Sequence, residues 1–476
     1  MAPLLAIALA TALPGCTIGP DYLRPLFETP ANWRVDYPQA AQLTNLRWWE
    51  QFQDPVLNQL VEKALRQNQD IRIAAERVEQ FLGQLQTTRS QFFPQVGYGL
   101  DVSRNRATEV GYTPLPSGTD PWYRLYQGTV SASWQIDLFG RVRRQNEAAQ
   151  ARVFASEQGR RGTLLTVVSG VAAGYITLRS LDRQLEIARA TADNYAGTLR
   201  IFQLRFQGGV VSQVEVSQIE SQYQQARIAI PQLEQQIAAQ ENLLSVLLGQ
   251  NPGPITRGRT LDELVLPVVP PGLPSSLIER RPDVLQAEQN LVAANANIGV
   301  ARSLYFPTIS ITGLLGSVSA ASSDFLSGPA EVAAIAANLS GPIFTFGAIE
   351  GQVRSAEAGE RAAMANYQAT IINALRDTND ALVGTQKAAD AFVAQQARVK
   401  ALREYARLSR LRFENGTASY LDVLYADNEL FSAELAAVGA GSDRLVQLIG
   451  VYRALGGGWV DEADTLTASG GQAKPG

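Results

Sequence analysis

The side chains that usually carry catalysis or bind metals are scarce in this sequence. Its 476 residues include no histidine, one cysteine and two methionines. Histidine is the commonest general base, a member of the Ser-His-Asp catalytic triad and a common zinc ligand, and this sequence has none. A single cysteine forms neither an intrachain disulfide nor a cysteine-based metal cluster. The sequence also has no convergent acid pair and no glycine-rich phosphate loop, so we expect no enzyme activity, no cofactor and no metal site.

The single cysteine stands at a position suited to lipid attachment. A short apolar run ends in Leu13-Pro14-Gly15-Cys16, which is typical of a bacterial lipoprotein signal peptide. We expect residues 1–15 to be removed and Cys16 to carry acyl chains such as palmitate, which anchor a protein stably. Thr17 follows instead of aspartate and favours the outer membrane. Pro14 and the lack of a basic residue before the run leave two alternatives, a plain secretory signal and an upstream start codon.

Charge and hydropathy narrow the class of protein further. The chain has 41 Lys and Arg against 45 Asp and Glu, a net charge of −4. Nucleic-acid binding normally needs a basic stripe, so we expect no nucleic-acid partner. After the N-terminus we find no apolar run long enough to cross a bilayer as a helix.

The chain is an internal tandem repeat. Phe93-Pro94 matches Phe306-Pro307 at an offset of 213 residues. Further along, LRFQGG at 204–209 matches LRFENG at 411–416, at an offset of 207. Each half therefore has the same order: a helix, an extended segment, a very long helix, a glycine turn and another helix.

The repeat sets the expected boundaries of the elements. The first repeat covers 51–249, with strands at about 94–104 and 128–139 and helices at 141–207 and 212–249. The second covers 277–456, with strands at about 306–316 and 333–344 and helices at 347–414 and 419–456. The segments outside the repeats are Pro-rich or extended: 16–50 at the N-terminus, an equatorial linker at 250–276 and a tail at 457–476.

The extended segments alternate between apolar and polar residues. In the first, Val96, Tyr98, Leu100 and Val102 alternate with polar residues and glycines. This period suits a half-buried sandwich strand or a transmembrane β-strand. Aromatic residues near the loops favour the second, because they resemble an interfacial belt; they are Trp122, Tyr123, Tyr126 and Phe325.

Four such strands cannot close a barrel by themselves. An open strand edge in lipid leaves backbone groups without hydrogen-bond partners, and small closed barrels begin at eight strands. Several copies must then share one barrel, with two copies giving eight strands and three giving twelve. The long helices fit a tubular wall better than a globular core, because 141–207 contains no proline and would span roughly 100 Å.

Four segments carry a resemblance to a known family. They are CTIGPDYLRP at 16–25, WWEQFQDPVLNQL at 48–60, the run containing ERRPDV at 277–310, and YRALGGGW at 452–459. Together they resemble the outer-membrane factor family, the TolC/OprM-like or NodT-type efflux lipoproteins. The resemblance implies a mainly α fold with transmembrane β structure. In the homotrimer, a twelve-stranded β-barrel continues into a twelve-helix periplasmic α-barrel, with a mixed α/β equatorial belt.

The resemblance also implies a function and partners. Such a chain is the exit duct of a tripartite pump for drugs or other small molecules, with a periplasmic adaptor and an inner-membrane transporter of the RND type. A duct for metal efflux or for type I secretion is the alternative within this class. An adaptor lipoprotein fits less well, because an adaptor has one helical hairpin whereas this chain has two. An envelope enzyme fits least.

Two acidic residues occupy equivalent repeat positions after the glycine turns. Glu215 follows Ser212 by three residues and Asp422 follows Ser419 by three, which is the spacing of a helix capping box. Capping alone would explain both carboxylates. The resemblance assigns them to the narrow periplasmic end of the duct, where acidic rings favour cations. It also assigns Leu421 and Tyr425 to this gate.

The turns themselves are the expected adaptor contacts. They contain Arg205, Gly208 and Gly209 in the first repeat and Arg412, Asn415 and Gly416 in the second. A basic residue near a helix C-terminus is also favourable through the helix dipole alone, by about 0.3–1 kcal/mol. Adaptor recognition and this capping role are both open for the two arginines.

Overall fold

A computed structural model describes residues 17–27, 30, 47–110, 116, 118–267 and 280–457. Cys16 and the expected signal peptide therefore lie outside the described residues. So do most of the N-terminal segment, the end of the linker and nearly all of the C-terminal tail.

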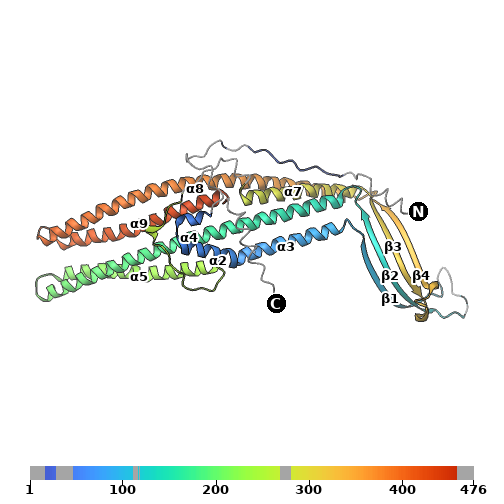
Figure 1. Ribbon diagram of the computed structural model, residues 1–476, viewed down its shortest axis with the longest axis horizontal. Coiled ribbons are helices and arrows are strands. Elements are labelled where there is room, and N and C mark those ends of the chain that lie inside the picture. Colours follow the sequence, from blue (N-terminus) through green and yellow to red (C-terminus); the bar gives the residue numbers. More distant parts are fainter. Residues whose placement is uncertain are drawn as a thin grey trace. The chain divides into compact units, whose positions relative to one another are not determined.

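Long helices account for most of the chain (Figure 1). They are α2 (Pro55–Gln67), α3 (Gln69–Ser90), α4 (Arg141–Gln207), α5 (Gln213–Leu247), α7 (Pro282–Arg302), α8 (Ala348–Glu414) and α9 (Tyr420–Ala454). Short 3-10 turns are η1 (Trp48–Phe52), η2 (Leu261–Glu263), η4 (Ser303–Tyr305), η5 (Ser322–Asp324) and η6 (Gly328–Ala330). Both ends of α8 and α9 are displaced by 207 residues from those of α4 and α5, so the repeat in the sequence is also a repeat in the structure.

The helix bounds lie close to the expected ones, with one break that the sequence pattern did not reveal. Helix α4 has the expected bounds, and α5, α8 and α9 differ from theirs by one or two residues at an end. The first helix of repeat 1 is divided at Asn68 into α2 and α3. The Asn68 amide accepts a hydrogen bond from Ile71 N (3.1 Å) and donates one to Leu247 O (2.8 Å). The Asn68 side chain thus caps the first turn of α3 and binds the end of α5, which fixes the position of the break.

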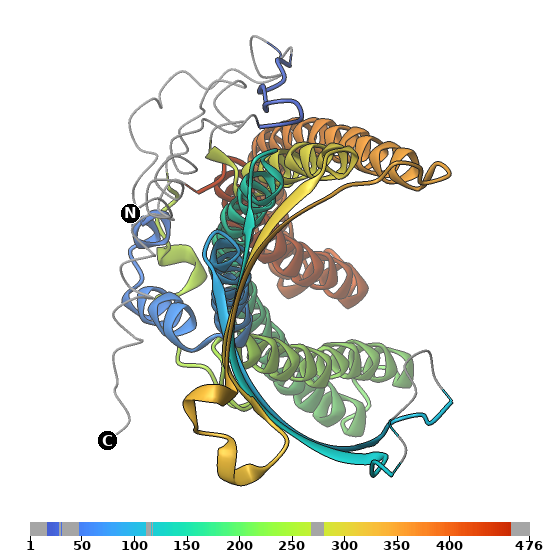
Figure 2. The same ribbon diagram turned by 90° about the vertical axis from the view of Figure 1, so that its right-hand side faces the viewer.

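The four strands form one antiparallel sheet in the order β1-β2-β3-β4, which Figure 2 shows as a strongly curved layer. The strands are β1 (Gln95–Arg106), β2 (Trp122–Ile136), β3 (Thr308–Ser319) and β4 (Glu331–Ser340). The expected start of β2 at 128 is wrong, because the ladder continues to the pair Arg106–Trp122. The expected end of β4 at 344 is also wrong. Gly341-Pro342 follows Ser340, and proline has no N–H for the ladder.

The sheet has one apolar and one polar face. The ladder pairs Val96 with Ala132, Tyr98 with Val130 and Leu100 with Gly128, so these side chains share a face. Neighbouring pairs extend this apolar face across β3 and β4: Trp134 with Ile311, Val130 with Leu315, and Ile309 with Leu339. Most of its large side chains are exposed in the single chain; Tyr98 and Ile335 are 85% and 84% exposed. Such a surface suits contact with lipid.

The four aromatic residues near the loops do not all lie on the apolar face of the sheet. Trp122, Tyr123 and Tyr126 lie within β2 and not in a loop. Trp122 and Tyr126 are on the apolar face, whereas Tyr123 pairs with Asn105 on the polar face. Phe325 covers the apolar face at Gly128, where a β-carbon would lie 2.6 Å from the Phe325 ring. The aromatic belt of one chain therefore consists of Trp122, Tyr126 and Phe325.

The two sequence repeats are not the two compact units of the chain. Unit 1 comprises the described residues within 1–26, 77–156 and 287–367, and it contains the whole sheet. Unit 2 comprises those within 27–76, 157–286 and 368–476. Each unit therefore combines segments from both repeats.

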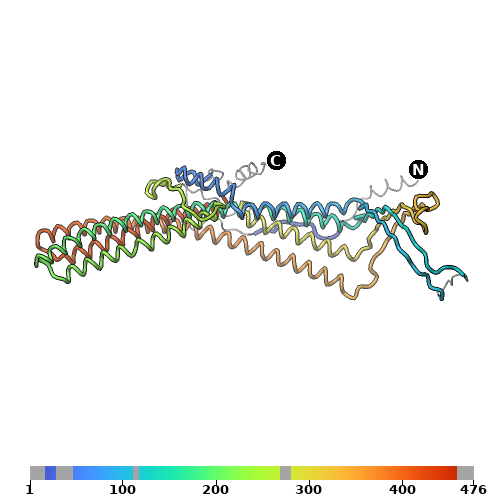
Figure 3. The backbone as a smooth tube through the Cα atoms, turned by 90° about the horizontal axis from the view of Figure 1, so that it is seen from below, coloured from blue at the N-terminus to red at the C-terminus, as the bar shows by residue number. Residues whose placement is uncertain are grey.

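Unit 2 has a large apolar core and two helical hairpins. Trp48, Trp49 and Phe52 of η1 are buried against α4 and the ends of α5 and α9. Helix α4 does contain an apolar stretch long enough to cross a membrane, contrary to the expectation that none exists, but most of this stretch is buried, as in a core helix. Hairpin 1 (α4 and α5) and hairpin 2 (α8 and α9) have their turns at the same end of unit 2 (left in Figure 3).

Candidate functional site

The turn of hairpin 1 is closed by its own backbone. Gly209 has φ of +72°, which favours glycine, and Val210 N donates to Arg205 O at 2.9 Å. Gly208 N donates to Leu204 O at 3.1 Å. This pattern is a Schellman-type helix end. The carbonyl of Arg205 thus fixes the turn, while its exposed guanidinium lies 5.7 Å from the Phe202 ring.

The turn of hairpin 2 repeats this geometry. Gly416 has φ of +70°, and Thr417 N donates to Arg412 O at 2.9 Å. The side chain of Asn415, which stands where the first turn has Gly208, donates to Leu411 O at 2.7 Å. Across the described part of the chain, neither Arg205 nor Arg412 forms an ion pair, so both exposed cations are available to a partner.

Glu215 is engaged as a helix cap. Its Oε2 accepts hydrogen bonds from Ser212 N (2.7 Å) and Ser212 Oγ (3.1 Å), and Glu215 N donates to Ser212 Oγ at 3.4 Å. The capping box expected from the sequence is therefore present at the start of α5. Glu215 is half-buried.

Asp422 forms the equivalent box with longer contacts. Its Oδ2 accepts from Ser419 N at 3.3 Å and from Ser419 Oγ at 3.4 Å. Asp422 is exposed. Of the two carboxylates, Asp422 is therefore the less committed to capping and the more accessible to solute.

The start of α9 is amphipathic around Asp422. Leu421 and Tyr425 are 54% and 60% exposed and lie one turn apart on the same side of the helix. Val423 and Leu424, in contrast, are buried. The structure thus places Leu421, Asp422 and Tyr425 together on the exposed surface of the first two turns of α9.

An aromatic cluster that the sequence did not reveal joins the two hairpins near their turns. We call Phe202, Phe413 and Tyr420 the aromatic junction. The Phe202 ring centroid lies 4.4 Å from that of Tyr420 and 6.4 Å from that of Phe413, and Phe413 and Tyr420 are 4.9 Å apart. Phe202 is 3% exposed. The junction packs α4 of hairpin 1 against α8 and α9 of hairpin 2.

A groove of about 480 Å³ follows the junction between α4, α8 and α9. Arg410 on α8 and Asp427 on α9 form an ion pair across part of it, at 3.0 Å. Burial raises the pKa of Asp427, and the Arg410 guanidinium opposes this shift. Burial likewise raises the pKa of Tyr195, which lines the groove from α4. The ion pair adds a polar link between the two helices of hairpin 2.

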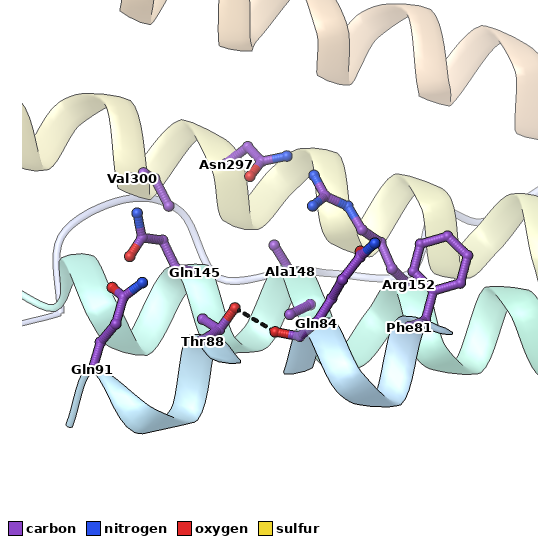
Figure 4. Close-up of a pocket in the computed structure, with 10 residues that line it drawn as sticks. Phe81, Gln84, Thr88, Gln91, Gln145, Ala148, Arg152, Asn297 and Val300 are labelled. Carbon is purple, nitrogen blue, oxygen red and sulfur yellow. Dashed lines mark hydrogen bonds between the residues drawn. The ribbon is translucent and has the colours of Figure 1, made fainter. Parts of the chain in front are cut away.

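A second cavity lies in unit 1 between α3, α4 and α7 (Figure 4). Its volume is about 310 Å³, and its lining is rich in amides, including Gln84, Gln145 and Asn297. Thr88 Oγ1 donates to Gln84 O at 3.0 Å. None of the site residues expected from the sequence lines this cavity. Among all described residues, no group of three or more potential ligands is placed to hold a metal ion.

Comparison with known proteins shows the family of this chain. The family model described as "Outer membrane efflux protein" matches residues 60–250 and 273–457. The chain belongs to the outer membrane efflux protein family. It is 33% identical over 467 residues to the toluene efflux pump outer membrane protein TtgC of Pseudomonas putida, with 96% of each chain covered.

Two further comparisons agree with membership in this family. The chain is 30% identical over 462 residues to the cation efflux system protein CusC of Escherichia coli, covering 96% of this chain and 98% of CusC. The crystal structure of the Campylobacter jejuni CmeC outer membrane channel matches with a TM-score of 0.90 at 22% identity, over 96% of this chain and 98% of that one. This last likeness concerns the fold. The chain is an outer-membrane efflux channel protein that extends into the periplasm.

The ERRPDV segment of this efflux protein is structural. Arg281 is buried, and its guanidinium donates to Ala454 O (3.0 Å) at the end of α9. It also donates to both carboxylate oxygens of Asp283 (2.7 and 3.0 Å) and lies 3.4 Å from an Asp377 oxygen on α8. Arg281 therefore joins the start of α7 to α8 and to the end of α9.

The WWEQFQDP segment is structural as well. Asp54 is fully buried and caps α2 by accepting from Val56 N at 2.8 Å. Its other oxygen accepts from Tyr175 OH (2.8 Å) and Arg259 N (2.9 Å). Burial and the Asp54 carboxylate raise the pKa of Tyr175. Asp54 thus ties α2, α4 and the segment after α5 together, and it has no direct place in a passage for solute.

Proposed function

We propose that three copies of this chain form the outer-membrane exit duct of a tripartite efflux pump. The observation that carries the proposal is the open sheet. Among the described strands, β1 pairs with β2 alone and β4 with β3 alone, so each end strand has an unpaired edge. In lipid such edges must be paired, and joining β4 of one copy to β1 of the next closes the barrel. Three copies give twelve strands and, from four periplasmic helices each, a twelve-helix tube.

The proposal includes a lipid anchor at Cys16. Support comes from the residues that follow it. A β-carbon at Gly140 would lie 2.9 Å from Thr17 Cα, and Ile18 N donates to Phe139 O at 3.4 Å. The buried Arg144 guanidinium holds the next residues through Gly19 O and Asp21. Thr17, the residue that follows the proposed anchor in the sequence, is thereby held at the junction between β2 and α4.

The hairpin ends form the periplasmic gate and docking site in this proposal. Asp422 and Glu215 would supply six carboxylates per trimer, and Leu421 and Tyr425 would narrow the same passage. The exposed turns with Arg205, Gly208, Gly209, Arg412, Asn415 and Gly416 would contact the periplasmic adaptor. The inner-membrane partner would be an energised transporter of the RND type.

We propose small organic molecules as the exported solutes. The support is the 33% identity to a protein named as part of a toluene efflux pump. Export of metal cations is the second candidate, because the chain is 30% identical to a protein named as part of a cation efflux system. A passive duct needs no solute-binding site of its own, so the transporter would choose between them.

The number of subunits tests the proposed assembly directly. The mature lipoprotein, purified in mild detergent, is expected to have a protein mass of three chains by native mass spectrometry. Cross-linking in outer-membrane vesicles should give dimers and trimers and no larger species. A mass of two chains would mean an eight-stranded barrel and would refute the twelve-stranded duct; a single chain would refute shared closure altogether.

A further inference from the structure

Two arginines face each other at the loop end of the apolar sheet face. In the ladder between β1 and β2, Arg104 is directly opposite Arg124, one step beyond the pair Val102–Tyr126. We call Arg104 and Arg124 the arginine pair. Because side chains of directly opposed residues point to the same face, both arginines extend the face that carries Val102 and Tyr126.

Among the described residues, the arginine pair has no counter-charge. Like charges directly opposite each other destabilise a sheet. Both side chains are exposed, and among the described residues neither forms an ion pair. The nearby Arg106 differs, because it pairs with Glu109 at 2.8 Å. The Arg104 guanidinium lies 5.0 Å from the Trp122 ring, which holds it at the level of the aromatic belt.

The position of the pair fixes which part of the membrane it meets. Four residues separate the end of β2 at Ile136 from the start of α4 at Arg141, so this end of the sheet is periplasmic. The arginine pair lies at the opposite end, next to the connection between β1 and β2. It follows an apolar stretch of β1 from Val96 to Val102, which covers about 20 Å. The pair therefore lies at the outer-leaflet surface, on the lipid side of the barrel.

We propose that the arginine pair binds phosphate groups of the phosphorylated glycolipid of the outer leaflet, lipid A. Two guanidinium groups side by side offer paired N–H donors that match phosphate oxygens, and they neutralise its charge. A bound phosphate also removes the repulsion between Arg104 and Arg124. Trp122 and Tyr126 provide the amphipathic surface that suits the headgroup level. This site lies on the outer surface of the duct and goes beyond its function in export.

The test uses the full-length mature protein in phosphatidylcholine nanodiscs. Bisphosphorylated lipid A, or lipid A with both phosphates removed, is added, and the retained lipid is counted by native mass spectrometry. The wild type should retain the phosphorylated form, and Arg104→Gln/Arg124→Gln should retain about tenfold less of it. Arg104→Lys/Arg124→Lys should retain an intermediate amount, because the charge persists without the planar fork.

The matched control is Arg354→Gln/Arg361→Gln, which removes two exposed arginines from α8. It should retain phosphorylated lipid A as the wild type does. In phosphatidylcholine alone, Arg104→Gln/Arg124→Gln should melt at a higher temperature than the wild type, because the like-charge pair is gone. Added phosphorylated lipid A should raise the melting temperature of the wild type and not that of the glutamine variant. Two outcomes would overturn the proposal. In the first, the wild type retains phosphorylated and dephosphorylated lipid A equally. In the second, the wild type and the glutamine variant retain equal amounts of phosphorylated lipid A.

Discussion

Replacing Phe202 by alanine is expected to loosen the hairpin ends and increase the conductance of the duct. The Phe202 ring is almost fully buried between Phe413 and Tyr420 and is the central member of the aromatic junction. Removing a buried phenylalanine typically costs about 3–5 kcal/mol, because packing is lost and a cavity remains. Since the junction joins hairpin 1 to hairpin 2, this cost falls on their association. Planar bilayer recordings and thermal unfolding of the purified protein measure the two effects.

The neighbouring substitution Gln203→Ala is the control for this prediction. Gln203 is exposed on the same turn of α4, so its removal should change neither conductance nor melting temperature appreciably. If Phe202→Ala lowers the melting temperature but leaves conductance at the wild-type value, the aromatic junction stabilises the hairpins without restraining the gate.

The second large effect is expected at Arg281. Changing Arg281 to methionine keeps much of the side-chain volume but removes the guanidinium hydrogen bonds to Ala454 O and to Asp283. Breaking a buried ion pair by removing one partner typically costs about 3–5 kcal/mol. We expect the lower part of that range, because the Asp283 side chain is 49% exposed and regains solvent contact. The free energy of unfolding from a denaturant titration measures the loss.

Arg280→Met is a close control for Arg281→Met. The two arginines are adjacent in the ERRPDV segment, but Arg280 is exposed. Its substitution should change stability by no more than about 0.5 kcal/mol. Equal effects of the two substitutions would show that Arg281 does not hold the ends of α7, α8 and α9 together.

The helices were predictable because their signals are local. The uninterrupted run from 141 to 207, the glycine turns and the Ser-x-x-Glu and Ser-x-x-Asp caps specify where α4, α5, α8 and α9 begin and end. The repeat strengthened each of these signals by presenting it twice.

The features that were missed depend on pairing between distant segments. The start of β2 at Trp122 follows from its register with Arg106, which an alternating pattern alone does not fix. The aromatic junction combines Phe202 with Phe413 and Tyr420 from the other repeat, over 200 residues away. The repeat offered one hint, because Phe413 is equivalent to Phe206 in the first repeat. This hint is misleading, since Phe206 is 42% exposed and does not belong to the aromatic junction.

Two of the segments that carry the family resemblance contain residues with a structural role. Asp54 and Arg281 could be named as parts of recognisable segments, but their sequence neighbours do not indicate which groups they bind. The structure gives both of them partners on three different elements. Their role is to join the ends of helices, and the residues proposed for the gate lie elsewhere in the sequence.

The most direct test of the proposed duct is its conductance and ion preference in planar bilayers, with Glu215→Gln/Asp422→Asn compared with the wild type. The amides can still cap α5 and α9 but carry no charge, so capping and pore charge are separated. Glu263→Gln is the matched control, because Glu263 forms the same capping box with Thr260. We predict a small, cation-preferring wild-type conductance whose preference is lost in the double variant and kept in the control. A large, unselective conductance in all three would contradict a gate built on these carboxylates.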